Sequence, residues 1–104
     1  FTGQATWYNT GLGACGETND DSHPIVAVSK DIFEQYNPSS GNPNENSLCG
    51  KKIEIDWQGK KQLVFAMDEC PSCAPSSLDL SPAVFKSLDD PDKGLLKGIQ
   101  WKFV

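Results

Sequence analysis

Two similar eight-residue segments occur in the sequence, and only the second has a carboxylate at its second position. They cover residues 26–33 and 78–85 and lie 52 residues apart, half the length of the 104-residue chain. Asp79 in the second segment stands where the first has Ala27. A fold that accepts alanine at this position does not itself demand an acid there, so Asp79 is the first candidate for chemistry.

A second acid and two hydroxyl groups are the next candidates. Asp68 ends an apolar, strand-like run, and Thr6 and Tyr8 alternate along the first strand-like segment of the chain. Two carboxylates close together raise the pKa of one of them, which gives a protonated donor beside a charged acceptor. Each acid also has a structural alternative, because Asp68 could cap a turn and Asp79 could accept from backbone donors near a helix start.

The repeated segments predict how Asp79 is positioned. In each, an apolar triplet reads as the end of a strand, and Ser29 or Ser81 then suits the N-cap of a short helix. Pro82 fits the first helical position after Ser81. The simplest account is a single domain, residues 1–104, made of two similar halves.

Period-two alternation predicts the remaining strands at residues 4–9, 25–28, 52–57, 62–67 and a last strand that contains Ile99, Trp101 and Phe103. Trp57 and Trp101 fall in apolar sets and are expected in the core, and Gln58 and Gly59 form a hairpin turn. Residues 38–47 form a polar connection, the segment expected to be most mobile. Because closure removes exposed strand edges, we predict a mostly β, six-stranded barrel with two or three short helices.

Composition excludes several partners. The net charge is −5, and no basic cluster is present to attract nucleic acid or an anionic membrane. No apolar stretch reaches the roughly 20 residues of a membrane-spanning helix. A neutral polymer approaches an acidic protein more easily than a polyanion does, and we expect a monomer.

The four cysteines fit two disulfides in an oxidising compartment, which makes secretion the leading expectation. A first residue that is Phe rather than Met is compatible with the loss of a signal peptide. Three connectivities are open, and we favour Cys15 with Cys49 and Cys70 with Cys73. A metal site or a redox motif is disfavoured, because only Cys70 and Cys73 form a close pair and a loop follows them. No cofactor is expected.

Six short motifs occur in order along the chain: Thr6 to Tyr8, Ala14 to Gly16, Leu48 to Gly50, Asp68 to Pro71, Leu78 to Ser81, and Trp101. Together they resemble the double-psi β-barrel of the expansin superfamily, especially the fungal single-domain loosenins. The resemblance covers nearly the whole chain and implies a secreted protein that loosens cell-wall polysaccharide, such as cellulose or chitin, without clear hydrolysis. It implies no carbohydrate-binding second domain after the barrel.

The resemblance also assigns site residues. Asp79 corresponds to the catalytic acid of the related family 45 glycoside hydrolases and Asp68 to a second acid, with Thr6 and Tyr8 at substrate-binding positions. Apart from the resemblance, the indole of Trp7 is a candidate platform for stacking on a sugar ring. By strand alternation Trp7 points away from Thr6 and Tyr8, so stacking on a sugar and packing against the protein are both open. The general base of those hydrolases would lie at position 9 or 10, where Asn9 and Thr10 cannot accept a proton.

Two alternatives to non-hydrolytic loosening remain. One is a glycosidase or lytic transglycosylase that uses a single acid. The other is a defence protein on the same barrel, similar to barwin or to papain inhibitors, for which fold analogy alone speaks.

Overall fold

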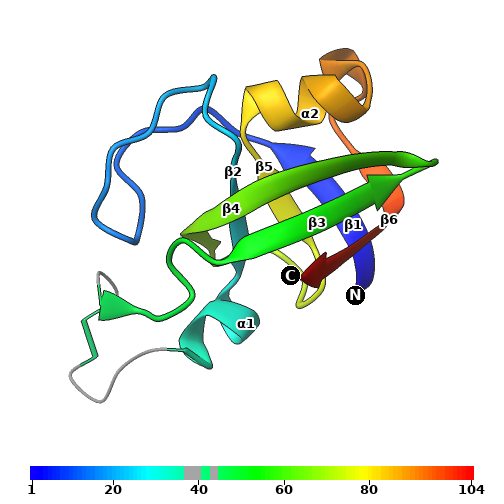
Figure 1. Cartoon of the computed structure of the whole chain (residues 1–104). Coiled ribbons are helices and arrows are strands. Elements are labelled where there is room, and N and C mark those ends of the chain that lie inside the picture. The colour runs from blue at the N-terminus through cyan, green and yellow to red at the C-terminus, as the bar shows by residue number, and fades with distance from the viewer. Residues whose placement is uncertain (37–40, 43–44) are drawn as a thin grey trace.

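The computed structural model describes residues 1–36, 41–42 and 45–104. Six strands close into one barrel in the order β1–β5–β2–β4–β3–β6 (Figure 1). The strands are β1 (Thr2–Trp7), β2 (Ile25–Ser29), β3 (Lys52–Trp57), β4 (Lys60–Cys70), β5 (Leu78–Leu80) and β6 (Leu96–Phe103). The helices described are α1 (Lys30–Glu34), α2 (Pro82–Leu88) and the short 3₁₀ helix η2 (Pro91–Lys93). The predicted mostly β, six-stranded double-psi barrel is confirmed.

The barrel is built from two interlocked halves. Strands β2 and β5 lie side by side and antiparallel, and Ala27 is paired with Asp79. Strand β5 also runs parallel to β1, as β2 does to β4. Exchanging β1 with β4, β2 with β5 and β3 with β6 leaves the strand order unchanged, so the repeat in the sequence corresponds to an approximate twofold symmetry of the barrel.

The two strand-to-helix corners make equivalent contacts. The hydroxyl of Ser29 caps α1 and donates to the carbonyl of Pro75 at 2.8 Å, just before β5. The hydroxyl of Ser81 caps α2 and donates to the carbonyl of His23 at 2.7 Å, just before β2. Each cap serine therefore holds the chain that leads into the other half, which explains why a serine stands at both strand-to-helix corners.

The core fills the barrel with the alternating apolar residues of the strands and the inner faces of both helices. Trp101 is 3% exposed, as predicted, and its indole donates to the carbonyl of Ser76 at 2.9 Å. Trp57 is only partly buried and packs against the edge of the core. Its indole donates to Asp89 at 3.1 Å, so a polar partner keeps this ring at the rim.

Strand β2 ends one residue later than predicted, at Ser29, and the bounds of β1 and β4 differ more. Strand β1 begins and ends two residues earlier than predicted, because Thr2 and Gly3 pair with β6. Strand β4 is longer at both ends, because it pairs with β3 along one edge and β2 along the other. The predicted hairpin turn is present, with positive φ at Gln58 and Gly59.

Parts of the expected mobile connection, residues 38–40 and 43–44, lie outside the described residues. Within the described part of the chain, no helix is long and apolar enough to cross a membrane.

Candidate functional site

Four side chains form a row across neighbouring strands of the barrel. Thr6 on β1 is paired with Asp79 on β5, Asp79 with Ala27 on β2, and Ala27 with Asp68 on β4. Residues paired across strands project from the same face of a sheet. The structure therefore brings the two predicted acids into one row, separated by the methyl group of Ala27.

Asp79 is partly buried and has one protein partner on its side chain among the described residues. The hydroxyl of Thr6 donates to its Oδ1 at 2.9 Å. Burial raises the pKa of Asp79, the Thr6 hydrogen bond opposes this rise, and the charge of Asp68 adds to it. The Oδ2 atom of Asp79 accepts no hydrogen bond from the described residues, so this carboxyl group can receive one from a ligand.

Asp68 has a different environment, because both of its oxygens are occupied. Its Oδ1 accepts from the backbone N–H groups of Ala14 and Glu69, each at 2.8 Å, and its Oδ2 accepts from the hydroxyl of Tyr8 at 3.2 Å. The chain can approach this closely because residue 13 is glycine: a Cβ on Gly13 would lie 2.9 Å from a backbone oxygen and 3.2 Å from the Asp68 carboxyl carbon. Asp68 thus fixes the Gly-rich loop, residues 10–16, to the barrel.

The phenol of Tyr8 stays protonated at neutral pH and therefore remains a hydrogen-bond donor. Burial, the charge of Asp68 and the hydrogen bond to Asp68 all raise the pKa of the Tyr8 phenol. Asp68 and Tyr8 therefore support the loop beside the site, while Asp79 with Thr6 offers the more open polar group.

A surface hollow of about 340 Å³ adjoins Asp79. Thr6 and Asp79 form one part of its lining, and Gln4 and the Cys70–Cys73 loop form another. Trp7 is not part of this lining; it is 37% exposed, and its indole donates to the carbonyl of Pro91 at 3.0 Å. A substrate-binding role of Trp7 stays a prediction.

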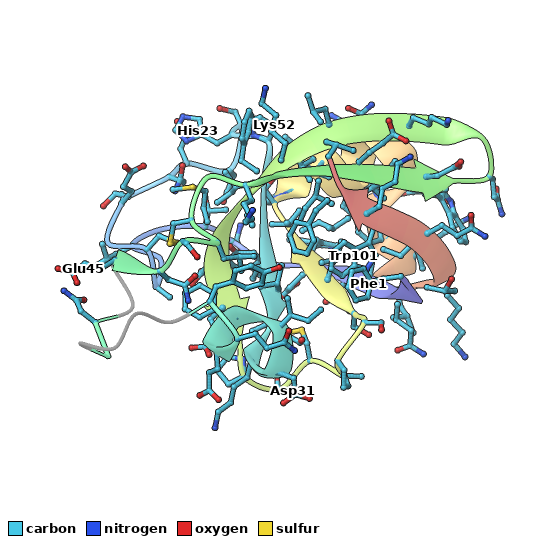
Figure 2. All side chains as sticks on the ribbon, turned by 60° about the horizontal axis from the view of Figure 1, so that its bottom comes forward. Phe1, His23, Asp31, Glu45, Lys52 and Trp101 are labelled. Atoms are coloured by element: carbon cyan, nitrogen blue, oxygen red, sulfur yellow. A yellow bond between two sulfur atoms is a disulfide. The ribbon has the colours of Figure 1, made fainter. Side chains whose placement is uncertain are left out.

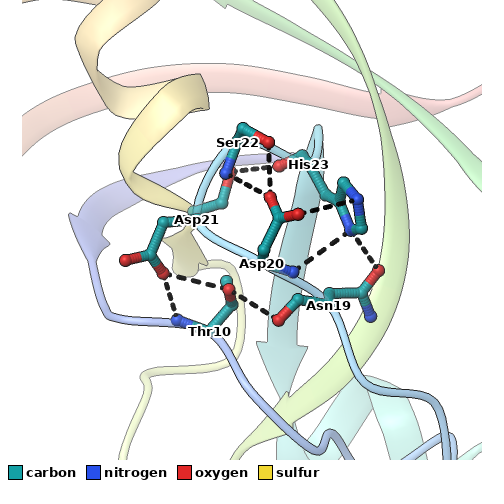
Figure 3. Close-up of polar contacts among 7 residues, drawn as sticks. Thr10, Asn19, Asp20, Asp21, Ser22 and His23 are labelled. Atoms are coloured by element: carbon teal, nitrogen blue, oxygen red, sulfur yellow. Dashed lines mark hydrogen bonds and ion pairs between the residues drawn. The ribbon is translucent and has the colours of Figure 1, made fainter.

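Asn9 and Thr10, at the two positions expected for a general base, instead donate hydrogen bonds to the carboxylate of Asp21, which lies in a loop (Figure 3). The Oδ1 of Asp21 accepts from the backbone N–H and the hydroxyl of Thr10, at 2.7 and 3.0 Å. Its Oδ2 accepts from the Asn9 amide at 2.9 Å. These bonds, that of the Thr10 backbone first, lower the pKa of Asp21. From sequence Asp21 reads as a solvated loop acid, and nothing in its local pattern signals these contacts.

His23 lies in the same loop and is exposed. Its Nε2 lies 3.3 Å from Asp20, and its Nδ1 accepts from the backbone N–H of Asp20 at 3.2 Å. Asp20 also accepts from the backbone and hydroxyl of Ser22. These contacts, drawn in Figure 3, stiffen the loop that presents Asp21.

Both favoured disulfides are present. Cys15 is bonded to Cys49 and Cys70 to Cys73, which confirms the predicted pairing. Bonded cysteines indicate an oxidising compartment.

A second hollow of about 350 Å³ lies on another side of the barrel, over β3 and β6. Phe1 borders it and stacks on Trp101 with ring centroids 4.3 Å apart. The two residues are labelled next to each other in Figure 2. It is lined by both acidic and basic side chains, among them Glu54, Asp56 and Lys61, and it contains no residue of the row.

A double-psi β-barrel family, whose model is described as lytic transglycolase, matches residues 1–100. The chain belongs to this family. It is also similar to the papain inhibitor of Streptomyces mobaraensis, at 39% identity over 107 residues that cover 100% of this chain and 71% of that protein. Allergen Asp f 7 of Aspergillus fumigatus is 32% identical over 97% of this chain but only 36% of its own length.

Solved structures give the same relationship. A Streptomyces papain inhibitor matches with a TM-score of 0.88 at 38% identity, over 100% of this chain and 93% of that one. An expansin of Clavibacter michiganensis matches with a TM-score of 0.76 at 25% identity, over 99% of this chain and 49% of that one. A mutant of this expansin, solved with cellohexaose, gives a TM-score of 0.79 at 24% identity, over the same shares of the two chains. The resemblance to the expansin superfamily is confirmed.

Proposed function

We propose that this protein acts outside the cell, where it binds a neutral cell-wall polysaccharide such as cellulose or chitin beside Asp79 and loosens it without hydrolysis. The observation that carries the proposal is the pairing of Thr6 with Asp79, a partly buried carboxyl with one open oxygen at the edge of a surface hollow. Such a pair can exchange hydrogen bonds with sugar hydroxyls. The cellohexaose bound to the expansin mutant supports a glycan as the partner class.

The arrangement of acids argues against conventional hydrolysis. An inverting glycosidase needs an acid and a separate base about 6.5–9.5 Å apart to activate water. The oxygens of Asp68 already accept hydrogen bonds from protein donors, and those of Asp21 accept from Asn9 and Thr10, so neither carboxylate is free to receive a proton from water. Asp79 can bind a ligand and donate a proton, but neither Asp68 nor Asp21 is a free partner to activate water.

The test is co-sedimentation with insoluble cellulose, chitin, xylan and peptidoglycan, combined with assays for wall loosening, new reducing ends and anhydro-sugars. We expect binding and loosening of at least one polymer without soluble products. Asp79→Asn should weaken binding about ten-fold or more, since a hydrogen bond to a charged group contributes about 1.5–3 kcal/mol.

Asp56→Asn is the matched control. It makes the same charge change at the β3–β4 turn, where an amide oxygen can still accept from the Gly59 N–H. Equal binding by the Asp79 and Asp56 variants would refute a site at Asp79. Release of anhydro-sugar that Asp79→Asn abolishes would instead establish lytic chemistry with one acid.

The second candidate function is inhibition of a papain-like cysteine protease. It is favoured by the 39% identity with a papain inhibitor over the whole chain. The exposed residues Pro71 and Ser72, braced by the Cys70–Cys73 disulfide, form a stiff loop of the kind that can enter a protease cleft. Papain assays with Ser72→Glu and Asp79→Asn separate the two functions: inhibition that only Ser72→Glu removes would support this candidate.

A further inference from the structure

The hollow beside Asp79 has a lining suited to a neutral ligand rich in hydroxyl groups. It contains the Gln4 amide, the hydroxyls of Ser72 and Ser77, and no cationic side chain. Phosphate or carboxylate ligands would lack a counter-charge there and would face Asp79. A volume of about 340 Å³ is within the range of small-ligand pockets.

The Cys70–Cys73 disulfide supplies part of the apolar lining, together with Ala74 and Leu78. Cys70 is 8% exposed and Cys73 is partly buried, and both contribute to the hollow. Sulfur is soft and polarisable, so it makes good dispersion contacts with the C–H groups of a ligand. A pyranose ring presents such C–H groups on its faces and hydroxyl groups around its edge.

The wall that contains the disulfide is held rigidly by three parts of the barrel. The carbonyl of Pro75 accepts from Ser29 at 2.8 Å, and that of Ser76 accepts from the Trp101 indole at 2.9 Å. The backbone N–H of Gln4 donates to the Ser77 hydroxyl at 3.3 Å. A wall that is already ordered loses little conformational entropy when a ligand binds.

We infer that this hollow is a sugar subsite continuous with the Thr6–Asp79 pair, in which one pyranose ring packs on the Cys70–Cys73 disulfide and hydrogen-bonds to Gln4. The inference rests on the proposed glycan binding. It adds that the glycan chain extends from Asp79 toward Gln4 and the Cys70–Cys73 loop. Gln4 determines affinity here and takes no part in chemistry. Its side chain has no hydrogen-bond partner among the described residues, so its amide is available to a ligand.

Titration with cellohexaose and chitohexaose tests this subsite. With whichever oligosaccharide the native protein binds, Gln4→Ala should weaken affinity about five-fold, the effect of one neutral hydrogen bond. Gln100→Ala is the matched control, because Gln100 is an exposed strand glutamine that borders the other hollow. The double variant Cys70→Ala/Cys73→Ala should lose at least as much affinity, with near-ultraviolet circular dichroism as the check of its fold.

A second measurement avoids substitutions altogether. In ¹⁵N-labelled native protein, the side-chain amide signals of Gln4 should shift on titration and saturate together with the backbone signal of Thr6, while those of Gln100 stay unchanged. Binding that Asp79→Asn weakens but Gln4→Ala does not, with unmoved Gln4 signals, would overturn the subsite and leave the proposed function intact. Absence of binding by the native protein to either oligosaccharide and to every polysaccharide tested would overturn both.

Discussion

Replacing Thr6 with valine removes the hydroxyl that donates to Asp79 and keeps a β-branched side chain of similar size. The hydrogen bond is 2.9 Å long and partly buried. Hydrogen bonds to charged groups contribute about 1.5–3 kcal/mol, and neutral ones about 0.5–1.5 kcal/mol. Because solvent partly reaches this pair, we expect Thr6→Val to lower the free energy of unfolding by about 1.5 kcal/mol when Asp79 is ionised.

The loss should depend on pH in a defined direction. The Thr6 bond lowers the pKa of Asp79, which means that it favours the carboxylate over the carboxylic acid. The difference in stability between native protein and Thr6→Val should therefore be largest at neutral pH. It should shrink to about half as the pH falls through the raised pKa of Asp79, where the carboxylate takes up a proton.

Urea unfolding at pH 7 and pH 3 measures both values. Thr6→Ser keeps the hydroxyl and is the matched control, expected to retain most of the pH-dependent part. Combining Thr6→Val with Asp79→Asn in a double-mutant cycle should give a coupling energy of about 1 kcal/mol at pH 7. A cost that is equal at both pH values, with no coupling, would show that the Thr6 hydroxyl does not support a charged Asp79.

Three further perturbations have equally definite outcomes. Burial raises the pKa of Asp79, so the contribution of its protonated form to the free energy of unfolding is complete below pH 3.8 and is lost as the pH rises through the raised pKa. Asp79→Asn should therefore gain stability relative to the native protein over that pH interval. A difference in urea midpoints that stays constant over the interval would contradict this. Cys15→Ser/Cys49→Ser removes a disulfide that closes a loop with a sequence separation of 34 and stabilises the folded protein by about 4 kcal/mol. Its loss should lower the calorimetric Tm by about 15–30 °C. An unchanged Tm would contradict this prediction. Gly3→Ala would place its Cβ against a backbone carbonyl of the loop before β5, and should lower the free energy of unfolding measured in urea by about 1–3 kcal/mol. Gly11→Ala has open space around it and should lower this free energy far less. Equal losses in the two variants would rule out the clash.

The architecture could be predicted because local sequence patterns indicate its strands and its strand-to-helix corners. Alternation marked β3 and the hairpin into β4, and serine after an apolar triplet marked both corners. The duplicated segments indicated two halves, and the strand order confirms them. Strand ends were less accurate, because β4 extends wherever it finds a partner strand, and partners are set by the whole barrel rather than by the segment itself.

Site details that depend on distant contacts could not be predicted. The roles of Asp21 as acceptor for Asn9 and Thr10, and of Asp68 as anchor of the Gly-rich loop, involve residues far apart in sequence or in a loop without periodicity. The bond from Trp7 to Pro91 spans 84 residues. Alternation predicted only that Trp7 points away from Thr6, not which group would receive its indole N–H.

The candidate site lies where the two halves of the barrel differ. The approximate twofold symmetry relates Asp79 to Ala27 and Thr6 to Asp68, so one half pairs an acid with a hydroxyl and the other pairs a methyl group with an acid. An acid at position 27 would be almost fully buried, at a site 2% exposed, directly opposite Asp79 and beside Asp68. Like charges directly opposite each other across two strands are destabilising, and burial increases the cost. Alanine at this position is therefore what allows two carboxylates to share the row, and the row depends on the difference between the two halves at residues 27 and 79.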